Sequence, residues 1–226
     1  MLEAVGLTAF YGPSQALFGI DLRVEAGQVV ALMGRNGMGK TTTIRALCRL
    51  TPPRAGRVLF EGRALAGSPP HKAARAGRGQ VPGGRRSGPN HTGAEGQPAT
   101  ARPDPWDRAR IEALLPRLAE RRAQMARTLS GGEQQMLAIG RALATNPRLL
   151  ILDEATEGLA PVVRQEIWSA LGALKSEGQS ILIVDKSLRE LLPLADACTI
   201  LERGRSVWHG RPDQLTADLR DRHLGI

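Results

Sequence analysis

The sequence predicts an α/β fold built around a mostly parallel sheet. Short apolar runs of strand length alternate along the chain with longer segments whose apolar residues recur at helical spacing. Two of these runs end at chemically distinctive places. Val29–Met33 leads into a glycine-rich segment, and Leu149–Leu152 leads into a pair of carboxylates. Helices between strands favour parallel pairing, because each helix carries the chain back across the sheet.

The N-terminal part of the chain is mostly predicted strand. Apolar runs separated by turn residues indicate strands at Leu2–Leu7, Gly19–Val24, Val29–Met33 and Val58–Phe60, the last as one side of a hairpin. A helix is expected from Gly39 to about Leu50, because Pro52 and Pro53 stop it.

The C-terminal half alternates predicted helices and strands. Helical spacing covers Asp107–Arg122 with an interruption at Pro116, then Gly131–Thr145, and then a segment that begins at Pro161. Strands are expected at Leu149–Leu152 and Ile181–Val184, followed by a hairpin of Thr199–Glu202 and Ser206–His209. Ser187 and Glu190 match the S-x-x-E pattern of a capping box, which would open a short helix.

Length and composition indicate an ordinary globular protein. A chain of 226 residues suits one large domain, and its longest aliphatic runs are far too short to cross a bilayer. The N-terminus lacks the basic and apolar regions of a secretion signal, so we expect a cytoplasmic chain or one peripheral on a membrane protein. Cys48 and Cys198 show no metal-ligand spacing and are expected to be reduced thiols.

The segment Gly34–Thr41 matches the phosphate-binding pattern G-x-x-x-x-G-K-[ST], between a predicted strand and a predicted helix as the pattern requires. Small residues let backbone N–H groups wrap phosphates, and the helix N-terminus adds partial positive charge. Lys40 is expected to reach the β- and γ-phosphates of ATP, and the Thr41 hydroxyl to ligate Mg²⁺. The predicted ATP-binding residues here are Gly34, Arg35, Asn36, Gly37, Met38, Gly39, Lys40, Thr41 and Thr42.

A carboxylate pair, Asp153 and Glu154, follows directly after the apolar run Leu149–Leu152. Side chains at the carboxyl end of a buried parallel strand emerge at the crevice where ligands bind. We expect Asp153 to hold Mg²⁺ and Glu154 to act as the catalytic residue that orients and polarises the attacking water. An apolar run that ends in two acidic residues is by itself weak evidence for a nucleotide site. The phosphate-binding loop in the same chain strengthens that interpretation.

A third segment, Leu129–Gln135, reads LSGGEQQ and lies between the other two. It opens a predicted helix whose free N–H groups offer a second place for a phosphate. The three segments in this order resemble the ATP-binding subunit of an ABC transporter, and the resemblance runs from about Leu2 to Ile226. Two such subunits meet head to tail in that family. The resemblance therefore implies that ATP held by the partner contacts Leu129, Ser130, Gly131, Gly132 and Glu133.

The resemblance also implies an architecture. Residues 1–226 would form a single ABC ATP-binding domain with a P-loop NTPase core, an N-terminal antiparallel β subdomain and a helical subdomain. The α/β core would comprise residues 1–65 and 146–226, and residues 66–145 would form the helical subdomain.

Three further positions take their roles from the resemblance. Tyr11 lies where the family carries an aromatic residue that stacks on adenine. Lys186 occupies the switch position, where many members have a histidine that contacts the γ-phosphate. Glu157–Leu159 stands where a loop of the family, the D-loop, touches the partner subunit.

Within the superfamily, the segments GRNGMGKTTT and NPRLLILDEATEGLAP and the closing HLGI resemble the second ATPase of branched-chain amino acid importers, with urea and short-chain amide importers close. The resemblance implies ATP and Mg²⁺ as cofactors and hydrolysis coupled to uptake of branched-chain amino acids or a similar polar solute. It implies as partners a sister ABC ATPase in a heterodimer or homodimer, two permease subunits and, indirectly, a periplasmic binding protein. The chain would lie peripherally on the cytoplasmic face of the inner membrane.

The stretch 66–110 departs from the family pattern. It holds eight Gly and seven Pro, and its large apolar residues are Val81 and Trp106 alone, so it is expected to be flexible. Gly83 stands where the family usually carries Gln or Glu in its Q-loop. Two explanations stay open: compensating frame shifts in a GC-rich gene, or a divergent loop.

Two other functions also stay open. Without the usual Q-loop residue, the chain would bind nucleotide and fail to drive transport. The net charge of +9 further allows a soluble ABC ATPase that acts on nucleic acid or the ribosome. Such proteins usually carry two cassettes or a long coiled-coil insertion, and this sequence has neither. Aromatic residues make up only 3% of the chain, so few side chains can stack on bases, and we expect no nucleic-acid partner.

Overall fold

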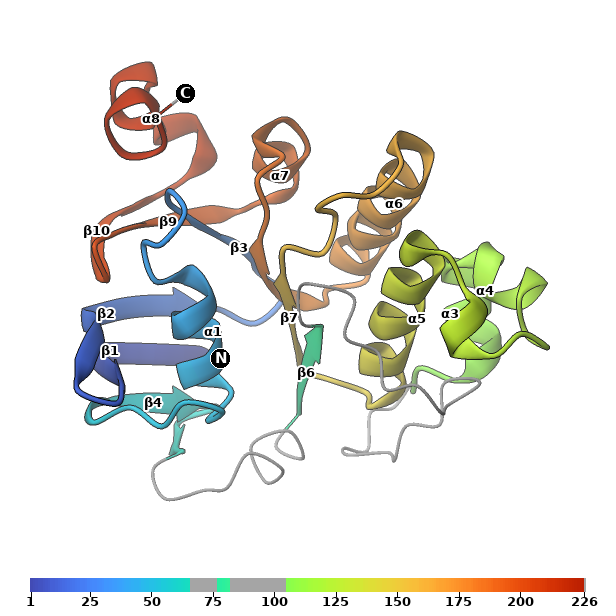
Figure 1. Ribbon diagram of the computed structural model, residues 1–226, viewed down its shortest axis with the longest axis horizontal. Coiled ribbons are helices and arrows are strands. Elements are labelled where there is room, and N and C mark those ends of the chain that lie inside the picture. Colours follow the sequence, from blue (N-terminus) through green and yellow to red (C-terminus); the bar gives the residue numbers. More distant parts are fainter. Residues whose placement is uncertain (66–76, 82–104, 226) are drawn as a thin grey trace.

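The computed structural model describes residues 1–65, 77–81 and 105–225, which form two β-sheets surrounded by helices (Figure 1). The larger sheet has six strands in the order β10-β9-β3-β8-β7-β6. All its neighbours pair in parallel except β10, which pairs antiparallel with β9. These strands are β3 Val29–Met33, β6 Arg78–Val81, β7 Leu149–Asp153, β8 Ser180–Val184, β9 Ala197–Glu202 and β10 Arg205–Gly210.

The smaller sheet is antiparallel throughout and has the order β2-β1-β4-β5. Its strands are β1 Leu2–Tyr11, β2 Ser14–Val24, β4 Ala55–Phe60 and β5 Arg63–Ala64. The Ser206 hydroxyl of β10 connects this sheet to the larger one, because it accepts from the Asp21 backbone N–H of β2 at 3.1 Å and donates to the Asp21 carbonyl oxygen at 2.8 Å.

Helices cover both faces of the larger sheet. In Figure 1, α5, α6 and α7 lie on one side of its central strands, and α1 lies on the other side beside the smaller sheet. The helices are α1 Lys40–Leu47, α3 Arg108–Leu114, α4 Pro116–Glu120, α5 Gly131–Ala144, α6 Pro161–Ser176, α7 Leu188–Leu194 and α8 Ala217–His223, with 3-10 turns at Ala126–Thr128 and Pro212–Gln214. Among the described residues, no helix combines the length and apolarity needed to cross a membrane.

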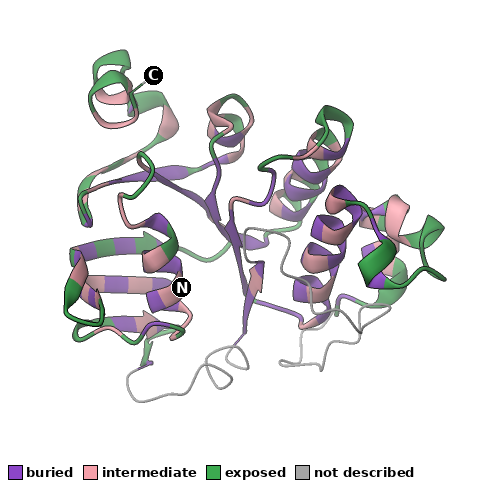
Figure 2. Ribbon diagram, viewed as in Figure 1, coloured by how far each residue is buried: buried purple, intermediate pink, exposed green. Residues whose placement is uncertain are grey.

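The core divides into two apolar layers because side chains alternate across each buried strand. Leu150 and Leu152 of β7 pack toward α5 and α6, whereas Leu149 and Ile151 pack toward α1 and the smaller sheet. Figure 2 shows the central strands almost wholly buried, whereas each helix is buried only along the side that faces the sheet. A sheet buried on both faces explains why its strands read as continuous apolar runs.

Most predicted elements are confirmed with small shifts at their ends. The strand Val29–Met33 is found as predicted, and the helix predicted after Gly39 ends at Leu47. Pro116 divides the predicted helix Asp107–Arg122 into α3 and α4. The capping box predicted for α7 is wrong: the Ser187 side chain forms no cap hydrogen bond, and its backbone N–H donates instead to Asp185 Oδ1 at 3.0 Å.

One strand was missed by the sequence analysis. Arg78–Val81 forms β6 at the edge of the larger sheet, in register with Leu149–Leu152 of β7. It lies inside the range 66–145 that the sequence assigned to a helical subdomain, and inside the stretch expected to be flexible. Trp106, in the same stretch, is buried beside α3 in the apolar core. Gly83 and the rest of that stretch outside 77–81 and 105–110 lie beyond the described residues.

Candidate functional site

The phosphate-binding loop occupies the turn from β3 into α1. Gly34 has φ 141°, and a Cβ placed there would lie 2.4 Å from the carbonyl oxygen of Leu201. Gly39 has φ 101°, and its Cβ would lie 2.9 Å from a methyl group of Leu17. Both backbone conformations favour glycine, so the pattern glycines are required by the geometry of the loop as well as by space for a ligand.

Lys40 is buried at the first turn of α1, and its side chain folds back over the loop. Its Nζ donates hydrogen bonds to the carbonyl oxygens of Gly34 at 2.6 Å and Arg35 at 2.9 Å. Burial lowers the pKa of the Lys40 ammonium, and the nearby carboxylate of Glu154 opposes that shift. The ammonium is therefore held at the centre of the loop, where a phosphate would exchange for two carbonyl partners.

Thr41 and Asp153 bring two oxygen groups together from different elements. The Thr41 hydroxyl of α1 donates to Asp153 Oδ1 at the end of β7 across 3.3 Å. Burial raises the pKa of the Asp153 carboxyl, while the Thr41 hydrogen bond and the Lys40 charge lower it. A hydroxyl and a carboxylate are hard oxygen donors of the kind that Mg²⁺ prefers, and Mg²⁺ usually takes its other ligands from water and phosphate. This donor pair fits the metal.

Glu154 continues from β7 into the cavity with φ 52°, and its backbone N–H donates to Val184 across 2.7 Å. Burial is the largest cause that raises the pKa of its carboxyl, followed by a hydrogen bond with Glu157. A carboxyl with a raised pKa beside a phosphate loop suits proton transfer with water. Lys186, from the loop after β8, forms an ion pair with Glu157 next to this carboxyl.

Asp185 is a structural residue of this site that the sequence analysis did not identify. It is 6% exposed, and its Oδ2 accepts hydrogen bonds from the Thr156 backbone at 3.1 Å and hydroxyl at 2.7 Å. Because its Oδ1 also holds the Ser187 backbone, Asp185 ties the loop after β7 to the loop after β8. The sequence places an acidic residue directly before the switch position, but no local pattern indicates its contact with Thr156.

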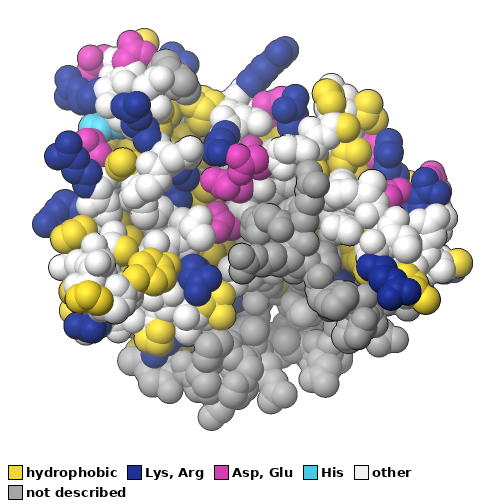
Figure 3. All heavy atoms as spheres, in the orientation of Figure 1, with side chains coloured by type: hydrophobic (Ala, Val, Ile, Leu, Met, Phe, Trp, Pro, Cys, Tyr) yellow, Lys and Arg dark blue, Asp and Glu magenta, His cyan; other side chains and the backbone are white. Residues whose placement is uncertain are grey.

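Lys40, Thr41, Glu154 and Lys186 line a cavity of about 540 Å³, within the usual size range of small-molecule sites. Its walls are Gln15, Ala16, Phe18, Asn36, Gly37, Gly39, Lys40, Thr41, Thr42, Glu154, Lys186, Arg203 and Gly204. Figure 3 shows acidic and basic side chains next to each other near the middle of the face, over the region where β7 ends in Figure 1. The loop and the catalytic candidate therefore share one open cavity.

Tyr11 and Phe18 are the exposed aromatic residues near this cavity. Tyr11 is 47% exposed, and its hydroxyl donates to the Thr42 hydroxyl at 3.4 Å. Phe18 is 38% exposed and forms part of the cavity wall itself, with the Arg205 guanidinium near its ring. Tyr11 is the aromatic residue expected from the family resemblance, whereas Phe18 lies within a strand and no pattern in the sequence marks it as a binding residue.

The predicted signature residues Leu129–Glu133 lie elsewhere, at the start of α5. Ser130 caps this helix: its hydroxyl accepts from the Glu133 backbone at 3.3 Å, and the Glu133 carboxylate accepts from the Ser130 backbone at 2.8 Å. The Arg121 guanidinium donates to Glu133 at 2.7 Å and is the first cause that lowers the Glu133 pKa, to about 2. Figure 1 places α5 across β7 from α1, so the signature segment does not share its own chain's cavity.

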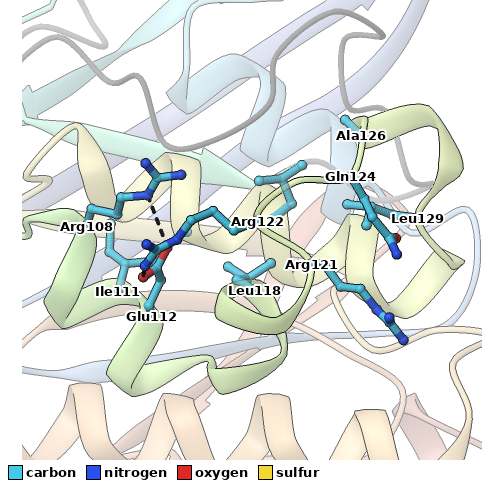
Figure 4. Close-up of a pocket in the computed structure, with 11 residues that line it drawn as sticks. Arg108, Ile111, Glu112, Leu118, Arg121, Arg122, Gln124, Ala126 and Leu129 are labelled. Atoms are coloured by element: carbon cyan, nitrogen blue, oxygen red, sulfur yellow. Dashed lines mark hydrogen bonds and ion pairs between the residues drawn. The ribbon is translucent and has the colours of Figure 1, made fainter.

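A second hollow lies beside the signature segment, between α3, α4 and α5 (Figure 4). Ile111, Leu118 and Leu129 form its apolar wall, and Glu112 at its mouth forms ion pairs with Arg108 and Arg122. Its volume is about 40 Å³, far below that of a nucleotide site. The first cavity, whose wall holds both the phosphate-binding loop and Glu154, is the candidate nucleotide site.

Comparison with known proteins identifies the family. The ABC transporter family model matches residues 17–157, which include the phosphate-binding loop, the signature segment and the carboxylate pair. The chain belongs to the ABC transporter family. It is 39% identical over 232 aligned residues to the high-affinity branched-chain amino acid transport ATP-binding protein BraG of Pseudomonas aeruginosa, and the alignment covers 100% of both chains. It is 31% identical to the lipopolysaccharide export system ATP-binding protein LptB of Acidithiobacillus ferridurans, over 100% of this chain and 97% of that protein.

Solved structures of ABC proteins share the fold of this ABC ATPase. The ATP-binding cassette MJ1267 superposes with a TM-score of 0.80 at 25% identity, over 98% of this chain and 95% of that one. An ATP-binding subunit of an ABC transporter superposes with a TM-score of 0.79 at 26% identity, over 100% of this chain and 96% of that one. These comparisons confirm the predicted α/β P-loop NTPase fold and establish an ATPase that binds nucleotide.

Proposed function

We propose that this ABC ATPase hydrolyses ATP to drive uptake of branched-chain amino acids or a similar polar solute through a membrane permease. The observation that carries the ATPase chemistry is the cavity whose wall brings the phosphate-binding loop together with Glu154. The similarity to BraG along the full length of both chains supports the solute class.

In this proposal the loop residues Gly34–Thr42 hold the phosphates of ATP. Backbone N–H groups and the Lys40 ammonium supply positive charge, and Lys40 exchanges its two carbonyl partners for phosphate oxygens. Tyr11 stacks on the adenine ring, for which its 47% exposure leaves a free aromatic face.

Mg²⁺ would be held by the Thr41 hydroxyl and the Asp153 carboxylate, whose contact supports this assignment. When bound, the ion supplies charge neutralisation for the phosphates. Glu154 orients the attacking water and accepts its proton, and Lys186 contacts the γ-phosphate from the switch position. Rate acceleration comes mainly from positioning and from stabilisation of charge.

The signature segment supports a paired assembly. Because α5 begins away from the chain's own cavity, the N–H groups of Gly131 and Gly132 are available to ATP held by another subunit. We infer a head-to-tail pair with a sister ABC ATPase or with a second copy. Two permease subunits and a periplasmic binding protein complete the transporter, with this chain on the cytoplasmic face of the inner membrane.

Uptake of radiolabelled leucine, isoleucine and valine by cells that lack the gene tests this function. Restoring the wild-type gene is expected to restore uptake of at least one of the three, whereas the Glu154→Gln gene restores none. Equal uptake with and without the gene for all three amino acids would contradict the proposed solute class. ATP hydrolysis by the purified chain would remain as a separate measure of the ATPase proposal.

A further inference from the structure

Two loops at the edge of the nucleotide cavity each carry one charged side chain. Glu157 lies on the loop after β7, and Lys186 lies on the loop after β8. The buried Asp185 carboxylate ties these loops together through Thr156 and Ser187. The tie fixes the backbones that carry Glu157 and Lys186, so the two side chains meet without either loop having to move.

Lys186 has a carboxylate partner in this structure. Its Nζ donates to Glu157 Oε1, and both side chains are about half exposed. The Glu157 hydrogen bond is the largest cause that raises the pKa of Lys186, and the charges of Glu154 and Asp185 act in the same direction. Glu157 is therefore the dominant anion around the Lys186 ammonium among the described residues.

Lys186 also forms part of the wall of the cavity, together with Lys40, Thr41 and Glu154. Lys40 and Lys186 line the same cavity, and the Lys186 charge adds to the burial that lowers the pKa of Lys40. A nucleotide whose β-phosphate lies on the loop would place a third phosphate among these side chains, whereas ADP would stop short of them. The Lys186 ammonium can therefore bind the γ-phosphate. Without nucleotide, this ammonium forms its ion pair with Glu157 instead.

We propose that Glu157 sets the preference of this site for ATP over ADP by competing with the γ-phosphate for Lys186. The inference deepens the proposed function and rests on it. An exposed ion pair is weak, so a doubly charged phosphoryl group displaces the carboxylate. ATP binding then releases Glu157, which stands on the loop that faces the partner subunit in the proposed assembly. ADP leaves the Lys186–Glu157 pair intact.

Calorimetric titration of the purified chain with ADP and with a non-hydrolysable imido analogue of ATP, both in the presence of Mg²⁺, tests this competition. Glu157→Gln is expected to raise the ratio of analogue affinity to ADP affinity by roughly two- to fivefold, because Lys186 no longer loses an ion pair. Lys186→Gln is expected to lower the ratio by roughly three- to tenfold, since the γ-phosphate loses a charged donor. Glu166→Gln is the matched control, because Glu166 forms a partly exposed ion pair with Arg117 on another part of the chain.

The double variant separates competition from a general effect on the loop. Glu157→Gln combined with Lys186→Gln is expected to match Lys186→Gln alone, because in this inference Glu157 acts through Lys186 and not through its hydrogen bond with Glu154. An unchanged ratio in Glu157→Gln, or the same rise in the Lys186→Gln background, would overturn the inference while nucleotide binding remains. If the wild-type chain binds neither ADP nor the ATP analogue, the proposed function is overturned together with this inference.

Discussion

Thr41 and Asp153 are 112 positions apart in the sequence, and the Thr41 hydroxyl donates to Asp153 Oδ1 across 3.3 Å. One residue comes from the first turn of α1 and the other from the end of β7. The parallel arrangement of β3, β8 and β7 explains the contact, because it brings the carboxyl ends of these strands to one edge of the sheet.

Asp153→Asn is expected to raise the Mg²⁺ concentration needed for half-maximal ATP hydrolysis roughly tenfold or more, because the metal loses a charged ligand. Steady-state hydrolysis over a range of Mg²⁺ concentrations measures this. Thr41→Ser keeps the hydroxyl and is the matched control, expected to stay near the wild-type requirement. The same Mg²⁺ requirement in Asp153→Asn and wild type would remove Asp153 from its assigned role.

Lys40→Ala is expected to weaken ATP binding roughly ten- to a hundredfold, because hydrogen bonds from a charged donor are worth about 1.5–3 kcal/mol. Equilibrium binding of a fluorescent ATP analogue measures the change. Lys175→Ala on α6 removes a lysine whose ion pair with Asp196 is remote from the loop, and it should bind as wild type does. If both variants bind equally well, Lys40 does not hold the phosphates.

Gly132→Ala is expected to destabilise the chain by about 1–3 kcal/mol, because overpacking at a helix contact forces the neighbours apart. A Cβ on Gly132 would lie 2.5 Å from Val163 Cγ1 of α6. Gly172→Ala, within α6, is the opposite case, since nothing lies within 4 Å of its added Cβ. Alanine there should stabilise the chain by roughly 0.5–1 kcal/mol through helix propensity. Urea unfolding compares the two, and equal effects would contradict the packing argument.

Glu133→Gln is expected to lower the free energy of unfolding by about 1–2 kcal/mol at neutral pH. The substitution removes the carboxylate charge that accepts the Ser130 N–H in the capping box of α5. The folded pKa of Glu133 is about 2, below its usual 4.5. A lowered pKa stabilises the fold above pH 4.5, and that stabilisation is lost as the pH falls toward 2. The stability difference from wild type should therefore shrink below pH 4.5.

Urea unfolding at several pH values follows this difference. Glu190→Gln is the control, because Glu190 lies in the first turn of α7, where the Ser187 side chain makes no cap. Its effect on the free energy of unfolding should be small, because it breaks no cap hydrogen bond. A Glu133→Gln deficit that stays constant from pH 6 to pH 3 would show that the carboxylate charge does not stabilise this helix start.

The sequence predicted the elements whose local signals agree with their tertiary setting. Val29–Met33 is apolar throughout because both faces of β3 are buried, and the glycine pattern that follows it has a fixed geometric role. The start of α5 was predictable for the same reason, since Ser130 and Glu133 stand at capping-box spacing and form that box. The positions of Lys40 and Thr41 followed from the phosphate-binding pattern after β3.

Other parts depend on contacts between distant segments. Arg78–Val81 has little strand pattern of its own, and it forms β6 because β7 offers an unpaired edge in register with it. The hydrogen bond between Thr156 and Asp185 joins residues 29 positions apart, and no local sequence pattern predicts it. Ser187 shows the reverse case: its capping-box spacing was present, and the Asp185 carboxylate took the N–H at the start of α7 instead.

The catalytic role of Glu154 is tested by measuring Mg²⁺-dependent ATP hydrolysis by the purified wild-type chain and by Glu154→Gln, with ATP binding measured on both. Wild type is expected to hydrolyse ATP, and Glu154→Gln is expected to bind ATP with similar affinity and to lose at least about 99% of turnover. Steady-state hydrolysis by Glu154→Gln at the wild-type rate would contradict the assignment of Glu154, and with it the proposed use of this cavity.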